Sequence, residues 1–424
     1  MSRIRPYWAT RNICGYRALG RCAYSSSRFN DLVEAADASL AKELRVGVLG
    51  LGAIGTIFFT RLGLLAINSN AKTELPTLKV DAFIKPEQFD VWTRKQKLQL
   101  CLEGKENEEK ESLKFQVNVD KVATVCNAPN VRVCTLESAE TDGLDVLLVA
   151  VKAYDSVGVI RELRYRNRHL LKDGALCVLL QNGLGEVPEE EAGGLGRLDD
   201  RWQFANGVTF VGGRVRTFGK VVTSGVDTGV TYLAPFGTDE GNHSDSDDEV
   251  LLRRVRDMKM ETLGEIFRAA GLRCEVLEDR KMQAMLWRKL IVNAAINPLA
   301  SLLDAPNKSV ASSDYSRHCV NMVVQEALAV AQCEKIALSC TQDELVEEIL
   351  DVARNTGTNV CSMLADLRRG SRTEIDAITG RIVEGGKRHG IPTPTNEILY
   401  SLIKALEKEE TRRSDLQTNS NLSA

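Results

Sequence analysis

The chain has 424 residues, 43% of them hydrophobic, and a formal net charge of −3 at pH 7. This length favours two domains over one, and the even charge balance, without a Lys/Arg stripe, argues against nucleic acid as a partner. The lack of any apolar run of about 18 residues argues against a membrane span, and eleven scattered cysteines with no C-x-x-C pair predict free thiols and no metal site.

The first thirty residues have the composition of a targeting segment. They contain six arginines and no acidic residue, and a run of three serines ends at Ser27. Such a composition is typical of a mitochondrial transit peptide, and the lack of a long apolar core argues against a secretory signal. We therefore expect residues 1–44 to stand apart from the fold and to direct the protein to the mitochondrial matrix. The alternative is a disordered tail on a cytoplasmic protein.

A glycine-rich motif follows the first predicted strand, at 45–49, and precedes a predicted helix at 56–62. Its six residues are Gly50, Leu51, Gly52, Ala53, Ile54 and Gly55. The order strand, G-x-G-x-x-G, helix is typical of a dinucleotide-binding turn. The glycines permit the turn, the approach of a pyrophosphate and close packing of helix on strand, and the helix N-terminus favours the phosphates.

The end of the second predicted strand, at 80–84, indicates which dinucleotide is bound. An NAD site usually places an acid there for the ribose 2′-hydroxyl, but this strand ends at Lys85. A cation suits a 2′-phosphate, so we expect NADP (NADPH) as the cofactor. Asp81, four positions earlier, is the alternative if the strand register differs.

Two further buried parallel strands are predicted at 145–151 and 175–180. They end at Lys152 and Asn182. Ligands bind beyond the carboxyl ends of such strands, so Lys152 is predicted to contact cofactor phosphate or ribose, and Asn182 the nicotinamide or the reacting carbonyl. A solvent-exposed lysine and a turn asparagine are the structural alternatives.

The remaining segments of the first predicted domain, 45–279, carry no evident chemistry. The charged stretch 94–121 is predicted to be a surface excursion, and the glycine-rich stretch 204–236 to be rich in strands. The acidic stretch 238–249 is predicted to be a disordered loop. A helix at 250–270 and a final strand at 273–277 complete this domain.

The second predicted domain, 280–410, is helical, and residues 411–424 are predicted to be a disordered tail. The predicted helices cover about 281–297, 312–334, 342–355, 360–369, 372–388 and 395–409. In the first of these, Lys289, Asn293 and Asn297 are four residues apart and share one face. Polar groups in an apolar run need partners, and Pro298 is expected to end this helix at the cleft.

A second constellation surrounds Gly370, which we expect to break the helix. Ser362 and Asp366 share a helix face before it, and Glu374 follows it. Glu374 has a structural explanation, because Ser371-x-x-Glu374 is a capping box. Glu374 also has a functional explanation, as a carboxylate that lies beside a substrate. The sequence pattern alone leaves both open.

These residues predict a nucleotide-linked reductase with an all-α second domain. Ketone reduction needs a hydride donor facing the carbonyl carbon, a proton donor at its oxygen and polar groups that orient the substrate. A lysine can be that acid, and its charge also stabilises the developing alkoxide.

The motifs resemble those of the ketopantoate reductases (2-dehydropantoate 2-reductases). Besides the glycine motif, the resemblance rests on Gln181-Asn182-Gly183, on the Lys-Asn-Asn block of 287–299, on Ser362-Met363-Leu364, on Thr373-Glu374-Ile375-Asp376, and on 389–394. It runs in order across roughly 45–405. It implies an α/β plus all-α fold, in which an N-terminal Rossmann NADP-binding domain precedes a helical domain of the 6-phosphogluconate dehydrogenase C-terminal type.

The resemblance also implies roles. Lys289 would be the general acid, and Glu374 would orient the reacting group and support the lysine on the cofactor side. Asn293, Asn297 and Ser362 would bind the substrate, Asn182 would lie between cofactor and substrate, and Lys85 and Lys152 would lie on the NADP side. The implied reaction is NADPH-dependent reduction of 2-dehydropantoate to (R)-pantoate, a step in pantothenate and coenzyme A synthesis.

Two alternatives remain at this point. One is a reductase of the same fold that acts on another 2-keto or β-hydroxy acid, and the other is a non-enzymatic NADPH-binding sensor. A reductase of either kind would bind a small keto acid as its substrate. The sequence leaves open whether the protein forms a homodimer.

Overall fold

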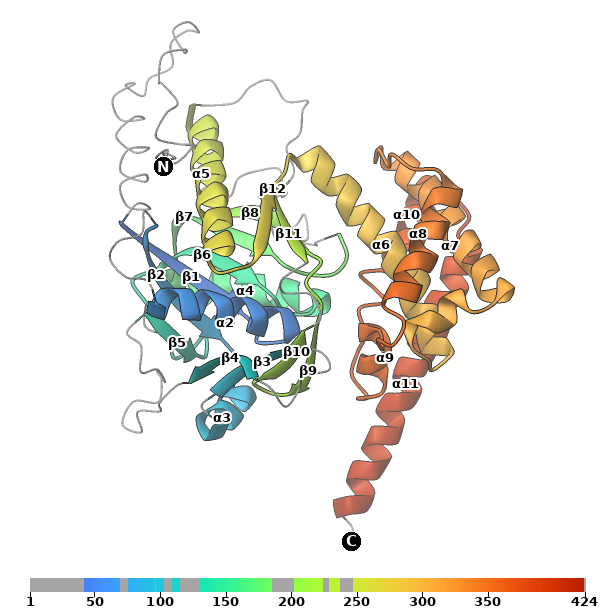
Figure 1. The fold of residues 1–424 in the computed structure, drawn as a ribbon, viewed down its shortest axis with the longest axis horizontal. Helices are drawn as coiled ribbons and strands as arrows, with labels where there is room; N and C mark the ends of the chain where they lie inside the picture. The colour runs from blue at the N-terminus through green and yellow to red at the C-terminus, as the bar shows by residue number, and fades with distance from the viewer. Residues whose placement is uncertain are drawn as a thin grey trace, which may run out of the picture.

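The computed structural model describes residues 42–68, 75–95, 97–102, 109–114, 130–139, 141–184, 202–223, 229–236 and 247–422. The targeting segment predicted at 1–30 and residues 238–246 of the predicted acidic loop lie outside these ranges. Figure 1 shows a part built on a sheet and an all-helical part, joined by helix α6 (Asp279–Leu302). No helix in the described ranges is long and apolar enough to span a membrane.

The larger sheet has eight strands in the order β12-β11-β8-β7-β6-β1-β2-β5. Its pairs are parallel except for β11, which runs antiparallel to β8. Because β1 lies between β6 and β2, the direction of winding reverses there, and a crevice opens beyond the carboxyl ends of these strands. The strands are β1 (Glu43–Leu49), β2 (Thr77–Phe83), β5 (Val131–Cys134), β6 (Leu144–Val149), β7 (Leu171–Leu179), β8 (Trp202–Thr209), β11 (Val230–Pro235) and β12 (Arg273–Val276).

Both faces of this sheet are covered by helices. On one face α2 (Ala53–Asn68) meets α5 (Asp247–Ala269), where the rings of Phe58 and Phe267 lie 5.0 Å apart edge to face. On the other face α4 (Ser156–Tyr165) packs beside the short 3-10 helices at 153–155 and 168–170. Residues 146–149 of β6 enter the two cores alternately, which is why all four of them are apolar. The Rossmann part of the predicted fold is confirmed.

A second, four-stranded sheet has the order β4-β3-β10-β9. The expectation of a mere surface excursion at 94–121 was therefore wrong for the strands described in this stretch. The alternate residues Leu98 and Leu100 are buried in the main core, and this alternation was hidden by the charges that follow it. The strands are β3 (Lys97–Leu102), β4 (Glu109–Lys114), β9 (Gly213–Thr217) and β10 (Lys220–Thr223), and α3 (Pro86–Lys95) precedes them.

The second part of the fold is helical, as predicted, and has its own core along α6. Helix α6 does not end at Pro298 but continues to Leu302. Proline removes only one backbone donor, and burial of Ala294, Ala295 and Leu299 in this core keeps the helix together. The other helices are a 3-10 turn (Asn307–Ala311), α7 (Asp314–Cys333), α8 (Gln342–Asn355), α9 (Ser362–Leu367), α10 (Thr379–His389) and α11 (Pro394–Leu422).

Other helix ends also differ from the prediction. Helix α10 begins at Thr379 rather than at 372, because residues 374–378 form a bend and turns. It ends at Gly390, which has a left-handed φ of 68°, as expected for a helix C-cap. Residues 411–422 continue α11 instead of forming a tail, since they contain neither glycine nor proline. Residues 247–249, predicted as loop, begin α5.

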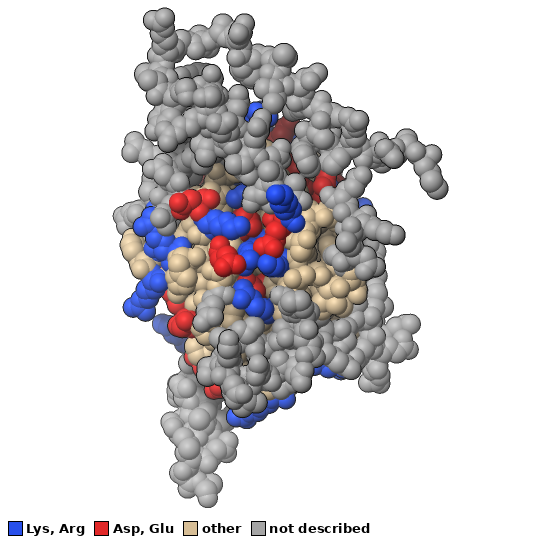
Figure 2. All heavy atoms as spheres, turned by 90° about the vertical axis from the view of Figure 1, so that its left-hand side faces the viewer, with Lys and Arg blue, Asp and Glu red and all other residues tan. Residues whose placement is uncertain are grey.

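The side of the sheet on which the strands begin carries charges of both signs. Figure 2 shows them interleaved on this side of the molecule. Several are paired, with Arg45 Nη2 2.6 Å from Asp142 Oδ2 and Lys79 Nζ 2.7 Å from Glu43 Oε2. Neither sign of charge dominates among the described residues on this side.

Candidate active site

The glycine-rich turn leads from β1 into α2 at the reversal point of the sheet. Gly50 has a φ of 91°, and its N–H donates to the carbonyl of Phe83 over 2.9 Å. A Cβ on Gly55 would lie 1.8 Å from the Gly50 oxygen, whereas one on Gly52 would meet nothing within 4 Å. The third glycine therefore permits close packing of helix on strand, and the second faces open space in which a phosphate fits.

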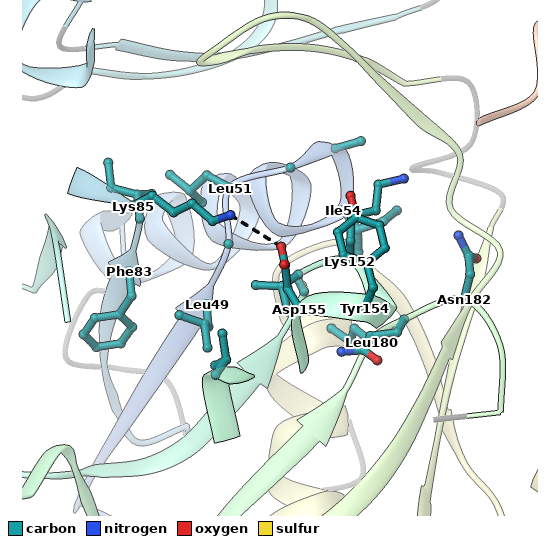
Figure 3. A pocket seen from close by; sticks show the side chains of 18 of the residues that line it. Leu49, Leu51, Ile54, Phe83, Lys85, Lys152, Tyr154, Asp155, Leu180 and Asn182 are labelled. Carbon is teal, nitrogen blue, oxygen red and sulfur yellow. Dashed lines mark hydrogen bonds and ion pairs between the residues drawn. The ribbon is translucent and has the colours of Figure 1, made fainter. Parts of the chain in front are cut away.

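A cavity of about 900 Å³ opens at this turn and extends to the helical part. The first five residues of the glycine motif, Gly50 to Ile54, line it, together with Lys85, Lys152, Asn182, Lys289, Ser362 and Glu374. Figure 3 shows Lys85 near one end of this cavity and Lys152, Tyr154 and Asn182 toward the other. Site residues predicted from six separate segments are thus brought together.

Lys85 follows the end of β2, as predicted, and its side chain is 65% exposed. Its ammonium lies 3.5 Å from Asp155 Oδ2 (Figure 3). Asp81, the alternative at this strand, lies inside β2, where its carboxylate accepts two hydrogen bonds from the Arg132 guanidinium, of 2.6 and 2.5 Å. This acid therefore does not face the cavity, and the group at the strand end is the cation.

Glu374 is the centre of a polar cluster between the two parts of the fold. Its Oε2 accepts from Asn182 Nδ2 at 3.0 Å and from Lys152 Nζ at 3.3 Å, and its Oε1 accepts from the backbone N–H of Ala153 at 3.2 Å. The capping-box explanation is wrong, since no helix begins at Ser371 and the carboxylate binds these donors instead. The capping box would have given Glu374 one local donor, the backbone N–H of Ser371. The structure gives it three donors from distant segments instead.

Lys152 is held by the helical part rather than left free for phosphate. Its ammonium also donates to Asp366 Oδ2 at 2.7 Å, and the two carboxylates raise its pKa against the effect of burial. The Asp366 carboxylate is itself buried and receives a second hydrogen bond, from Arg369. Lys152 therefore links the Rossmann part to the loop that carries Glu374.

Lys289 lies on α6, and its ammonium donates to the carbonyl of Thr209 at 2.8 Å. It also stands 5.6 Å from the ring centre of Phe210, which lines the same cavity. Burial lowers the pKa of Lys289 to about 8, and the Glu374 carboxylate opposes part of this shift. A lysine with such a pKa releases and regains its proton readily near neutral pH.

A smaller cavity of about 250 Å³ adjoins the large one, since Asn182, Gly213 and Ser362 line both. Asn293 and Asn297, predicted as substrate ligands, line it. Sequence reasoning missed three other polar residues of its wall, which are Arg214, Asn307 and Asn359. They lie in a short strand and in two interhelical connections, where no periodic pattern marks a face. Asn307 directly follows Pro306, and this loop signal was the only available hint.

Most polar side chains of the smaller cavity have free hydrogen-bonding capacity. Among the described residues, no protein group bonds the side chains of Asn293, Asn297, Asn359 or Ser362. Asn307 Nδ2 donates to Thr356 Oγ1 at 2.9 Å, whereas its buried Oδ1 has no partner. Unpaired amide and hydroxyl groups offer both donors and acceptors, so the cavity suits a small polar ligand.

Comparisons with known proteins agree with this geometry. A family model described as "Ketopantoate reductase PanE/ApbA" matches residues 46–237, and its C-terminal counterpart matches residues 281–407. A 2-dehydropantoate 2-reductase of Pyrobaculum aerophilum is 33% identical over 276 residues, which cover 64% of this chain and 80% of that protein.

Two solved structures share the fold at lower identity. A ketopantoate reductase of Ralstonia eutropha aligns with a TM-score of 0.63 and 24% identity, over 87% of this chain and all of that one. A D-mandelate dehydrogenase solved with NADH and anilino(oxo)acetate aligns with a TM-score of 0.64 and 20% identity, over the same shares. Because the family models together match most of the chain, the resemblance predicted from the motifs is confirmed, and this protein belongs to the ketopantoate reductase family.

Proposed function

We propose that this protein reduces 2-dehydropantoate to (R)-pantoate with NADPH, a step of pantothenate and coenzyme A synthesis. The observation that carries the proposal is the course of helix α6. Lys289 lines the cavity of the glycine-rich turn, and Asn293, one turn further along, lines the small polar cavity. On this proposal, Lys289 would donate its proton between the dinucleotide and a small polar substrate. The reductase names of the relatives support the same reaction class.

The residues at the glycine-rich turn fit a phosphorylated dinucleotide. The open space at Gly52 and the N-terminus of α2 would hold the pyrophosphate, and Lys85 would meet the 2′-phosphate. Lys152 and Asn182 lie toward the other end of this cavity, on the side of the reacting atoms. When bound, NADPH supplies the hydride.

Lys289 would hold the proton that the carbonyl oxygen needs. At pH 7 most of this lysine is charged, because its pKa is about 8. The carbonyl of Thr209 orients the ammonium, which lies in a partly desolvated site where its charge stabilises an alkoxide strongly. Glu374 supports this charge and holds Asn182. Asn293, Asn297 and Ser362 would bind the hydroxyl and carboxylate groups of the substrate.

The proposal is tested by following NADPH oxidation by the purified protein with 2-dehydropantoate. The controls are NADH in place of NADPH and unbranched 2-keto acids in place of the substrate. Fast turnover that prefers NADPH and 2-dehydropantoate supports the proposal. If unbranched 2-keto acids react equally well, the named substrate is wrong, and if NADPH binds without turnover, the enzymatic proposal is wrong.

Replacing Lys85 with glutamate is expected to raise the Kd for NADPH about tenfold or more, and the Kd for NADH much less. The change removes a charge-assisted hydrogen bond to the 2′-phosphate and adds repulsion. Both Kd values are measured by cofactor fluorescence. The control is Arg94→Glu, which makes the same charge change at an exposed site on α3. Equal effects on the two cofactors would refute a 2′-phosphate role for Lys85.

A second candidate is a reductase for a bulkier 2-keto acid. The ring of Phe210 is 51% exposed and lines the large cavity close to Lys289, so an apolar wall is available beside the reacting group. The substrate comparison above decides between the two candidates, provided that aryl 2-keto acids are included.

We also propose that residues 1–30 direct the protein to mitochondria, because they are rich in arginine and lack acidic residues. A fluorescent protein fused to these residues is expected to enter mitochondria. A fusion in which the six arginines are replaced by glutamine serves as the control and should stay in the cytosol. Diffuse cytosolic signal from the unmodified fusion would contradict the proposal.

A further inference from the structure

Arg214 is the one residue of the small cavity wall that carries a charge. The rest of that wall consists of amide, hydroxyl, thiol, glycine and valine residues. The substrate proposed above is an anion, and its carboxylate must lie close to the carbonyl that is reduced. A charged group that faces a small polar cavity beside the proton donor is therefore a candidate partner for that carboxylate.

The other cations at the two cavities are engaged within the protein. Carboxylates pair with Lys85 and Lys152, and a backbone carbonyl accepts from Lys289. The side chain of Arg214, a partly buried residue, has no hydrogen bond or ion pair to any residue that the structure describes. Its guanidinium therefore keeps all five N–H donors for solvent or for a ligand in the cavity.

We infer that Arg214 binds the carboxylate of the 2-keto acid, an assignment that rests on the function proposed above. The planar guanidinium can donate two parallel hydrogen bonds to a carboxylate, which a lysine ammonium cannot do. Arg214 then fixes the acid end of the substrate, while the amides of α6 meet its remaining oxygens. The ketone is left to face Lys289.

The backbone of Arg214 is held firmly against the cofactor side of the site. A Cβ on the preceding residue, Gly213, would lie 2.8 Å from Ile57 Cδ1, so β9 packs closely on the first turn of α2. On the other side Thr223 Oγ1 donates to the Gly212 carbonyl at 2.7 Å. The backbone that carries the Arg214 side chain therefore lies against the same helix that begins at the glycine-rich turn.

This assignment also separates two tasks that Lys289 could not perform together. A carboxylate paired directly with its ammonium would favour the charged form and raise the lysine pKa. The pKa of about 8 fits a group that must give up a proton during turnover. With Arg214 on the carboxylate, the lysine keeps its ammonium for the carbonyl oxygen.

The test compares Arg214→Met and Arg214→Lys with the unmodified protein on two substrates, 2-dehydropantoate and its neutral lactone. For Arg214→Met, kcat/KM for the acid is expected to fall about 10- to 100-fold, mainly through KM. For the lactone, kcat/KM should change less than about threefold, because no carboxylate is present. Arg214→Lys should recover part of the loss, since the charge remains without the fork.

Arg216→Met is the matched control, because Arg216 lies on the same strand and lines neither cavity. Unchanged NADPH affinity of both methionine variants would show that the fold is intact. If Arg214→Met keeps the full preference for the acid over the lactone, the inference is wrong. If the unmodified protein reduces neither compound, the proposed function fails instead.

A binding measurement, which needs no turnover, distinguishes failure of the Arg214 assignment from failure of the proposed function. Oxamate is a 2-keto acid analogue that is not reduced, and its binding to the NADPH-loaded protein can be followed by cofactor fluorescence. Binding about 10- to 100-fold weaker in Arg214→Met than in Arg216→Met supports the assignment. Equal binding in the two variants overturns it, whatever the natural keto acid is.

Discussion

Replacing Lys289 with alanine is expected to lower kcat by a factor of about 10²–10⁴, which is the usual contribution of a positioned general acid together with its charge. NADPH affinity should change little, because the lysine lies on α6 in the helical part and not in the glycine-rich turn. Turnover is measured by NADPH oxidation, and affinity by cofactor fluorescence.

The matched control for this prediction is Lys281→Ala. Lys281 lies two turns earlier on α6, and its side chain is 68% exposed. This variant removes the same side chain from the same helix without touching the cavity, so it should behave like the unmodified protein. If Lys289→Ala retained more than about a fifth of the turnover, the acid would have to be another group. A non-enzymatic sensor would be indifferent to both changes.

Replacing Glu374 with glutamine is expected to lower kcat roughly 10²-fold. The amide has nearly the shape of the carboxylate but carries no charge, and it brings an NH₂ group toward the donors of Lys152 and Asn182. Charge-assisted hydrogen bonds of this kind are worth about 1.5–3 kcal/mol each. The Lys152 ammonium would keep Asp366 as its partner, so the two parts of the fold should stay linked.

The pH profile separates this role from a structural one. Activity needs protonated Lys289, so kcat/KM of the unmodified protein should fall as the pH rises through about 8. The Glu374 carboxylate raises the pKa of Lys289, and its loss should therefore move this fall to lower pH. Glu384→Gln, at an exposed site on α10, should leave it in place. An unmoved fall in Glu374→Gln would mean that the carboxylate acts only through the fold.

The sequence predicted those parts of the site that depend on the spacing of residues close to one another in the chain. The glycine motif and the four-residue spacing of Lys289, Asn293 and Asn297 follow from strand and helix geometry alone, and all of these residues except Gly55 line one of the two cavities. The family resemblance suggested the roles, and it favoured a functional Glu374 over the capping box, two explanations that the local pattern had left open.

The parts that were missed depend on contacts between distant segments. Arg214 reaches the small cavity only because β9 pairs with β10 and packs on α2, and nothing in its neighbours indicates this. Pro298 was expected to stop α6, since the local cost of proline is visible in a sequence and the gain from burying the surrounding side chains is not. The packing of Leu98 and Leu100 in the main core was likewise not visible from the sequence, because it depends on burial against distant segments.

The uninterrupted course of α6 has a consequence for how this site can vary between proteins. Because one continuous helix carries Lys289, Asn293 and Asn297, their mutual spacing is set by a rise of about 1.5 Å and a rotation of about 100° per residue. The positions between them pack in the helical core and line neither cavity, so a substitution there leaves the spacing intact. A one-residue insertion between Lys289 and Asn293 would turn the amides by about 100° away from the acid, so this stretch can diverge in composition but not in length.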